Sequence, residues 1–242
     1  MADLIPLPGT IGNVFTIDRS QWIAINDRVE LVISAKPVAN DVSQVLPSYL
    51  DLLAVCEKWK STTFASLIAQ AVAVNLFAQR AADALAKLKA RLTGLRPSDP
   101  VPQDVAFIFK ADFATLEQMA ANLRNTAVTL ATAVDALVKE NRVADQVLTG
   151  IGESLASLWP PLKDFWQPIA GTINLLEGAL TDVQTDWDKV TAILNAGASQ
   201  SVTITVAALL ATDITGAVDA WQRLQNVTLA FDSMASTLTF TC

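Results

Sequence analysis

Apolar residues recur at alternating spacings of three and four positions along most of the chain, which is the pattern of one buried face of an α-helix. Prolines divide this pattern, because they interrupt helices. Three long stretches contain no proline: 48–96, 103–159 and 169–242. The pattern predicts an all-α fold with little or no β-structure. The predicted long helices cover about residues 43–94, 104–158, 164–196 and 206–238.

The first long helix shows the pattern most regularly. Its seam follows strict 3,4 spacing through Phe64, Leu67, Ala71, Val74, Ala78, Ala81, Leu85, Leu88 and Leu92. Pro47 suits a first helical turn, and Gly94 followed by Pro97 marks the end. A shorter segment, about 18–35, fits either a leading helix or a strand, and we favour a short N-terminal helix.

Sustained seven-residue spacing is typical of antiparallel bundles with coiled-coil-like packing. At 1.5 Å per residue, a helix of about 50 residues spans roughly 75 Å. We therefore expect one elongated helical-bundle domain over 1–242. Trp187 and Trp221 fall on seam positions, so we expect both in the core.

Composition argues against catalysis. The chain has 242 residues, 52% hydrophobic and 17% charged, with two cysteines and no histidine. Histidine, the commonest metal ligand and near-neutral acid/base, is therefore absent, and zinc fingers, zinc hydrolases and Cys/His proteases are excluded. We expect no enzyme, no catalytic residue, no metal and no cofactor.

The net charge of −7 argues against nucleic acid as a partner, which requires a positive surface. The excess lies in residues 143–242, which carry 3 basic and 10 acidic side chains.

One pole of the predicted bundle combines two unusual compositions. Residues 190–212 carry no charge. The end of the first long helix beside them is basic, through Arg80, Lys87, Lys89, Arg91 and Arg96. This arrangement suits docking to an anionic bilayer. The residues predicted to contact the membrane are Val202, Ile204, Val206, Leu209 and Leu210. The alternative interpretation is a helix dipole attracting cations beside an ordinary buried helix and loop.

Neither 190–212 nor the uncharged 61–79 is a convincing membrane span, because Ser, Thr, Gln and Asn interrupt both. The opening MADLIPLPGT lacks the features of a signal peptide. We expect a soluble protein that is secreted or released without a classical signal peptide, with the cytoplasm as the alternative. Membrane lipids are an expected partner only under conditions that change the protein's shape.

Three predicted helical segments each contain a tryptophan: LLAVCEKWKSTTFASLIAQA, LEGALTDVQTDWDKVTAIL and AVDAWQRLQNVTLAFDSM. They resemble helices of the α-helical pore-forming toxins of the cytolysin A, haemolysin BL and xenorhabdolysin type. The resemblance covers about residues 45–240 and lies in helix length and tryptophan position. The chain departs from the group at LWPPLKDFWQPIAG, where those toxins carry a long apolar insertion. Either the head is reduced, or 195–208 replaces it, or the chain is a partner component without its own membrane element.

The resemblance implies a cytolysin, or a component of a multi-component toxin, that docks on membranes and oligomerises. Its expected partner is another toxin component or further copies of itself. The alternative function is a non-lytic helical-bundle interaction, scaffold or surface-coat protein.

The predicted topology brings Cys56 and Cys242 to the same pole, so a disulfide between them is a candidate clasp. If the disulfide forms, protein purified without reductant has no free thiol, as measured by reaction with a thiol reagent after denaturation. Two free thiols would contradict the disulfide.

Overall fold

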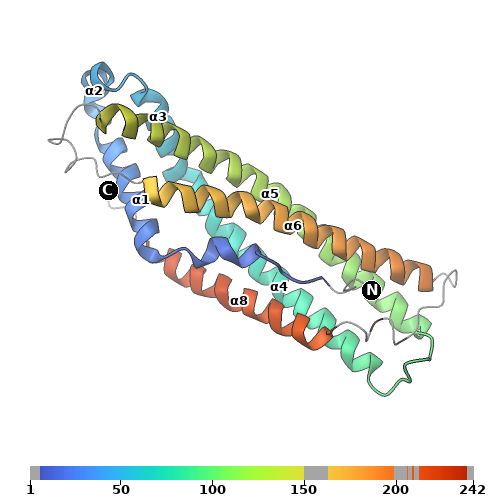
Figure 1. Ribbon diagram of the computed structural model, residues 1–242. Helices are drawn as coiled ribbons and strands as arrows, with labels where there is room; N and C mark the ends of the chain where they lie inside the picture. Colours follow the sequence, from blue (N-terminus) through green and yellow to red (C-terminus); the bar gives the residue numbers. More distant parts are fainter. Residues whose placement is uncertain (1–5, 150–162, 199–205, 207–208, 210–212, 239–242) are drawn as a thin grey trace. The chain divides into compact units, whose positions relative to one another are not determined.

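The computed structural model describes residues 6–149, 163–198, 206, 209 and 213–238 (Figure 1). Every element in these residues is helical, which confirms the all-α prediction. In chain order the elements are η1 (Ile11–Thr16), α1 (Arg19–Ser34), η2 (Lys36–Val38), α2 (Ala39–Val45), α3 (Tyr49–Lys58), η3 (Trp59–Thr63), α4 (Phe64–Leu92), α5 (Gln103–Thr149), α6 (Lys163–Ala198) and α8 (Ile214–Ala235).

Most predicted helices match these elements. The helix α1 confirms the helical interpretation of residues 18–35. The helices α5 and α6 occupy the second and third predicted ranges, although the predicted end of the second, 150–158, lies outside the described residues. The α8 helix lies within the fourth range, and most of the predicted start of that helix is likewise outside the described part.

The predicted start of the first long helix was wrong. The helix α2 ends at Val45, and a new helix begins only at Tyr49. Leu46 adopts φ −123° and ψ 89°, because the ring of Pro47 disfavours helical geometry in the residue before it. Pro47 therefore separates two helices instead of opening one. A turn of π-helix, η3, then joins α3 to α4.

The chain forms two compact units. Unit 1 comprises residues 1–12, 72–125 and 176–229, and unit 2 comprises 13–71, 126–175 and 230–242. The helices α4, α5, α6 and α8 each supply residues to both units, so the division follows no linker in the sequence. The prediction of a single domain stays a prediction.

Unit 1 is held together by a line of aromatic side chains from four helices. Phe77 of α4 packs edge-on against Trp221 of α8, with ring centroids 5.1 Å apart. Trp221 contacts Trp187 of α6 at 6.3 Å, and Trp187 contacts Phe113 of α5 at 5.1 Å. Both tryptophans are fully buried, which confirms their predicted place in the core.

Polar side chains align α4 with α8 in unit 1. The Asn75 side-chain amide donates to the Gln225 carbonyl oxygen at 2.9 Å and to Thr228 Oγ1 at 3.0 Å. Fourteen positions later on α4, Lys89 Nζ donates to Thr215 Oγ1 at 2.6 Å. Because the later α4 residue contacts the earlier α8 residue, the two helices run antiparallel.

Unit 2 has its own aromatic core around Trp22 of α1. The Trp22 ring stacks on Trp59 at 6.4 Å and contacts Phe64 at 6.0 Å and Phe231 at 5.8 Å. Trp59 Nε1 donates to Asn26 Oδ1 at 3.0 Å, so the Trp59 indole has a buried hydrogen-bond partner. These contacts attach α1 to the start of α4 and the end of α8.

A buried ion pair fixes α1 to α5 in unit 2. Arg28 Nη1 lies 3.0 Å from Asp145 Oδ1, and the two side chains are only 1% and 14% exposed. Taking both charges out of water is costly, and their mutual attraction offsets this cost only while both are present.

Removing one member of this pair should therefore lower the free energy of unfolding much more than removing both members. Arg28→Met is expected to lower the free energy of unfolding by about 3–5 kcal/mol, and adding Asp145→Leu should recover most of that loss. Chemical denaturation measures both. As a control, Lys36→Met breaks the exposed Lys36–Glu57 pair and should cost no more than about 1 kcal/mol. Equal losses in the Arg28 single and double variants would contradict this account.

Candidate membrane-docking surface

The turn between α4 and α5 forms a well-defined end of unit 1. Gly94 has φ 91°, a conformation that suits glycine and ends α4 after Leu92. Further along, the Arg96 backbone N–H donates to Asp99 Oδ2 at 3.0 Å, and the Asp99 N–H donates to the Arg96 carbonyl oxygen at 2.9 Å. We call this segment, residues 93–102, the docking turn.

All five predicted basic residues are exposed around this end of α4. They are Arg80, Lys87, Lys89, Arg91 and Arg96. The structure adds Lys110 of α5, which is also exposed and which the sequence analysis did not single out. Residues 80–112 thus carry six basic and four acidic side chains, so this stretch is net positive in a chain whose net charge is −7.

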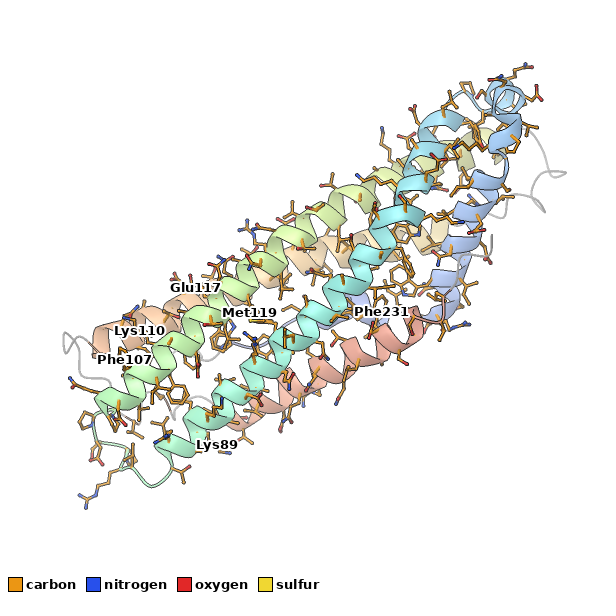
Figure 2. The ribbon with its side chains drawn as sticks, turned by 180° about the vertical axis from the view of Figure 1, so that it is seen from behind. Lys89, Phe107, Lys110, Glu117, Met119 and Phe231 are labelled. Atoms are coloured by element: carbon orange, nitrogen blue, oxygen red, sulfur yellow. The ribbon has the colours of Figure 1, made fainter. Side chains whose placement is uncertain are left out.

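Two large apolar side chains lie on the first turns of α5. Phe107 is 69% exposed and Ile108 is 46% exposed, whereas the next residue, Phe109, is buried. Lys110 lies one helical turn after Phe107, and Figure 2 shows the two near the same end of α5 as the docking turn. The sequence contains the signal for this surface, because successive helix positions are about 100° apart. Three consecutive apolar residues therefore cannot all face one core.

The residues predicted to touch a membrane divide into two groups. Val206 and Leu209 are buried, at 0% and 2% exposure. The Val206 backbone N–H donates to the Asp99 carbonyl oxygen at 2.9 Å, so this position is attached to the docking turn. Val202, Ile204 and Leu210 lie outside the described residues. Membrane contact by Val206 or Leu209 requires a rearrangement, and this contact stays a prediction.

A cleft of about 330 Å³ separates α4 from α5 beside the basic residues. Its lining consists of Arg80, Asp83, Ala84, Lys87, Asp112, Thr115 and Leu116. No ion pair joins its charged residues to any other described residue. Arg80 Nη1 instead contacts Met119 Sδ at 3.7 Å. The cleft adds both signs of charge to this face of unit 1.

Unit 2 contains the only thiol in the described part of the chain. Cys56 is fully buried, and burial raises the pKa of its thiol to about 12 despite the nearby Arg28 guanidinium and the Asn141 side chain. The group is therefore protonated at neutral pH and is a poor nucleophile. Burial also lowers the pKa of Arg28, which the hydrogen bond to Asp145 partly offsets. Cys242 lies outside the described residues, so the disulfide remains a prediction.

No group of three or more His, Cys, Asp or Glu side chains is placed to hold a metal ion within the ranges described above. The segment Tyr49–Leu92 is long and apolar enough to cross a membrane, but 44% of its most apolar window is buried, and core helices of soluble proteins meet the same criterion.

No family model and no curated protein matches the chain.

The buried thiol predicts a loss of stability at alkaline pH. In the unfolded chain the thiol releases its proton near pH 9.0, whereas in the folded chain it retains the proton until about pH 12. The unfolded state then binds fewer protons, so the free energy of unfolding falls as pH rises through this range, by up to about 1.4 kcal/mol per pH unit.

Denaturation curves across this range should show a shallower decline in Cys56→Ala than in the parent chain. Burial also raises the pKa of Tyr49, with smaller contributions from Cys56 and Glu57, so the variant keeps the burial contribution of Tyr49 and loses the contribution from Cys56. Identical slopes in the two proteins would show that Cys56 does not cause the alkaline loss.

Proposed function

We propose that the protein is a membrane-docking helical bundle of the pore-forming toxin type. It acts alone, as a homo-oligomer or with a partner component. The docking surface consists of Phe107 and Ile108 together with the exposed cations beside the docking turn. The observation that carries this proposal is the 69% exposure of Phe107 at a positively charged end of unit 1.

A lipid bilayer is a better binding partner than another protein for a surface that combines cations with an exposed aromatic side chain. Aromatic side chains favour the interface between headgroups and acyl chains. Each nearby Lys or Arg contributes about 1 kcal/mol of attraction to an anionic leaflet. Burying one Phe side chain contributes about 1.5–3 kcal/mol more. The cations bring the protein to the bilayer, and the apolar pair holds it there.

Docking alone does not breach a membrane, so a second step is needed. Residues 190–212 carry no charged side chain, so their transfer into lipid has no charge penalty. Val206 and Leu209 are covered in the structure, so they become available only after docking. This order keeps the protein soluble until it meets a membrane.

A second candidate function is a non-lytic scaffold or coat. Unit 2 exposes Val38 at 51%, Val45 at 50% and Leu50 at 60%. These residues lie on or beside the short elements η2, α2 and α3, away in sequence from the docking turn. They would serve a bundle that binds an apolar surface without rearranging.

The two functions differ in which apolar residues matter. With vesicles of phosphatidylcholine and phosphatidylserine, Phe107→Ser combined with Ile108→Ser should weaken binding at least about tenfold. The matched control, Leu50→Ser in unit 2, should leave binding unchanged. Co-sedimentation measures binding, and release of an encapsulated dye measures lysis. Ile204→Asp, which places a charge in the charge-free stretch 190–212, should preserve binding and helicity but abolish release.

Several outcomes would overturn the proposal. Wild-type protein that neither sediments with these vesicles nor releases dye, alone or with proteins encoded beside it, excludes the toxin function. Binding without release, lost in Leu50→Ser but kept in the Phe107 and Ile108 variant, would instead favour the coat function.

A further inference from the structure

Three polar atoms buried along one stripe of α6 have no hydrogen-bond partner among the described residues. They are Trp187 Nε1, Thr191 Oγ1 and Asn195 Oδ1. The residues are four positions apart, so they lie on the same face of the helix over successive turns. Trp187 is fully buried, and Thr191 is 8% exposed.

The preceding part of the same helix has no such defect. Between 176 and 183 the buried positions of α6 are Leu176, Ala179, Leu180 and Val183, all apolar. Within unit 1, α6 therefore changes from an apolar interior face to one on which three side chains leave a polar atom unpaired. The change occurs at Trp187, where α6 meets Phe113 of α5.

Other buried polar atoms of the described residues also lack a partner, including Trp22 Nε1 in unit 2, but none of them forms a run of three along one helix. In unit 1, the Asn75 amide has two partners on α8. In unit 2, Asn26 Nδ2 and Asn141 Oδ1 are unpartnered, but the other amide atom of each side chain is bonded, to Trp59 and to the Leu137 carbonyl oxygen. Only α6 presents three unpartnered atoms on consecutive turns of one face among the described residues.

An unpaired polar atom inside a protein regains its hydrogen bonds when water reaches it, so each one favours local opening. The three atoms act on one continuous segment, and their effects combine. We propose that residues 187–198 of α6 form a segment poised to separate from unit 1, while residues 176–183 stay packed. Separation gives water to the three polar atoms and uncovers the neighbouring Val190 and Leu194.

The position of this segment gives the opening a role at the membrane, and this role rests on the proposed function. The segment contains the first part of the charge-free stretch 190–212. It also packs, through Trp187, on Phe113, which lies on α5 shortly after the exposed Phe107 and Ile108. Release of α6 from this contact frees residues 190–198, which are the described first part of the charge-free stretch.

Hydrogen exchange of the soluble protein tests the opening without any membrane. Amides of 187–198 should exchange faster than those of 176–183. Thr191→Val combined with Asn195→Leu removes two of the unpaired atoms with little change in size, and should slow exchange in 187–198 by about fivefold to tenfold. Thr181→Val is the matched control, because Thr181 Oγ1 already donates to the Glu177 carbonyl oxygen at 2.9 Å.

Equal exchange rates in residues 176–183 and 187–198, or no slowing of exchange in the double variant, would overturn the proposal. The control separates a general effect of valine from the effect of removing an unpaired atom, since equal slowing in Thr181→Val would also overturn it. Dye release supplies the membrane arm, in which the double variant should bind vesicles normally but release dye more slowly. Slower exchange with no vesicle binding by the wild-type protein would leave the opening in place and refute the toxin function alone.

Discussion

A polar atom that folding removes from water needs a partner, and this requirement governs how the helices of this protein can pack. Its seams are rich in alanine, whose small side chains suit a close approach of neighbouring helices. Some buried polar side chains find a partner within their own helix, as Asn141 does at Leu137, and others find one on a neighbouring helix. A partner on a neighbouring helix fixes register: Asn75 aligns α4 with α8, and Arg28 fixes α1 on α5 at Asp145.

The aromatic side chains fill the interior where more than two helices meet, because alanine side chains are too small to do so. Trp187 and Trp221 bridge this space in unit 1, and Trp22 and Trp59 do so in unit 2. Each buried tryptophan also has an indole N–H group that needs a hydrogen-bond acceptor. Trp221 donates to the Pro6 carbonyl oxygen and Trp59 to Asn26, whereas the Trp22 and Trp187 groups have no partner among the described residues. A buried tryptophan can therefore fill the interior well while its N–H group has no hydrogen-bond partner.

Periodicity predicts helices and seams because burial on a helix depends on spacing alone, which is why Trp187 and Trp221 could be assigned to the core. The break at Leu46 was missed because Pro47 suits a helix start as well as a helix stop, and only the backbone of the preceding residue decides. The Arg28–Asp145 pair joins residues 117 positions apart, which no local pattern reveals. Exposure of Phe107 was predictable from its two apolar neighbours, whereas the unpaired atoms of α6 depend on what neighbouring helices offer.

The two unusual features of unit 1 are physically linked through α5. Phe107 is exposed on its first turns, and Phe113, about two turns later, holds Trp187 at the point where the interior face of α6 becomes polar. A surface that draws Phe107 into lipid acts on the same rigid helix end that supports Trp187. If docking favours opening of 187–198, then opening must favour docking by the same factor, because the two equilibria share one cycle. Repairing the α6 interior should therefore stabilise the soluble state and weaken the coupling, while leaving the chemistry of the docking surface untouched.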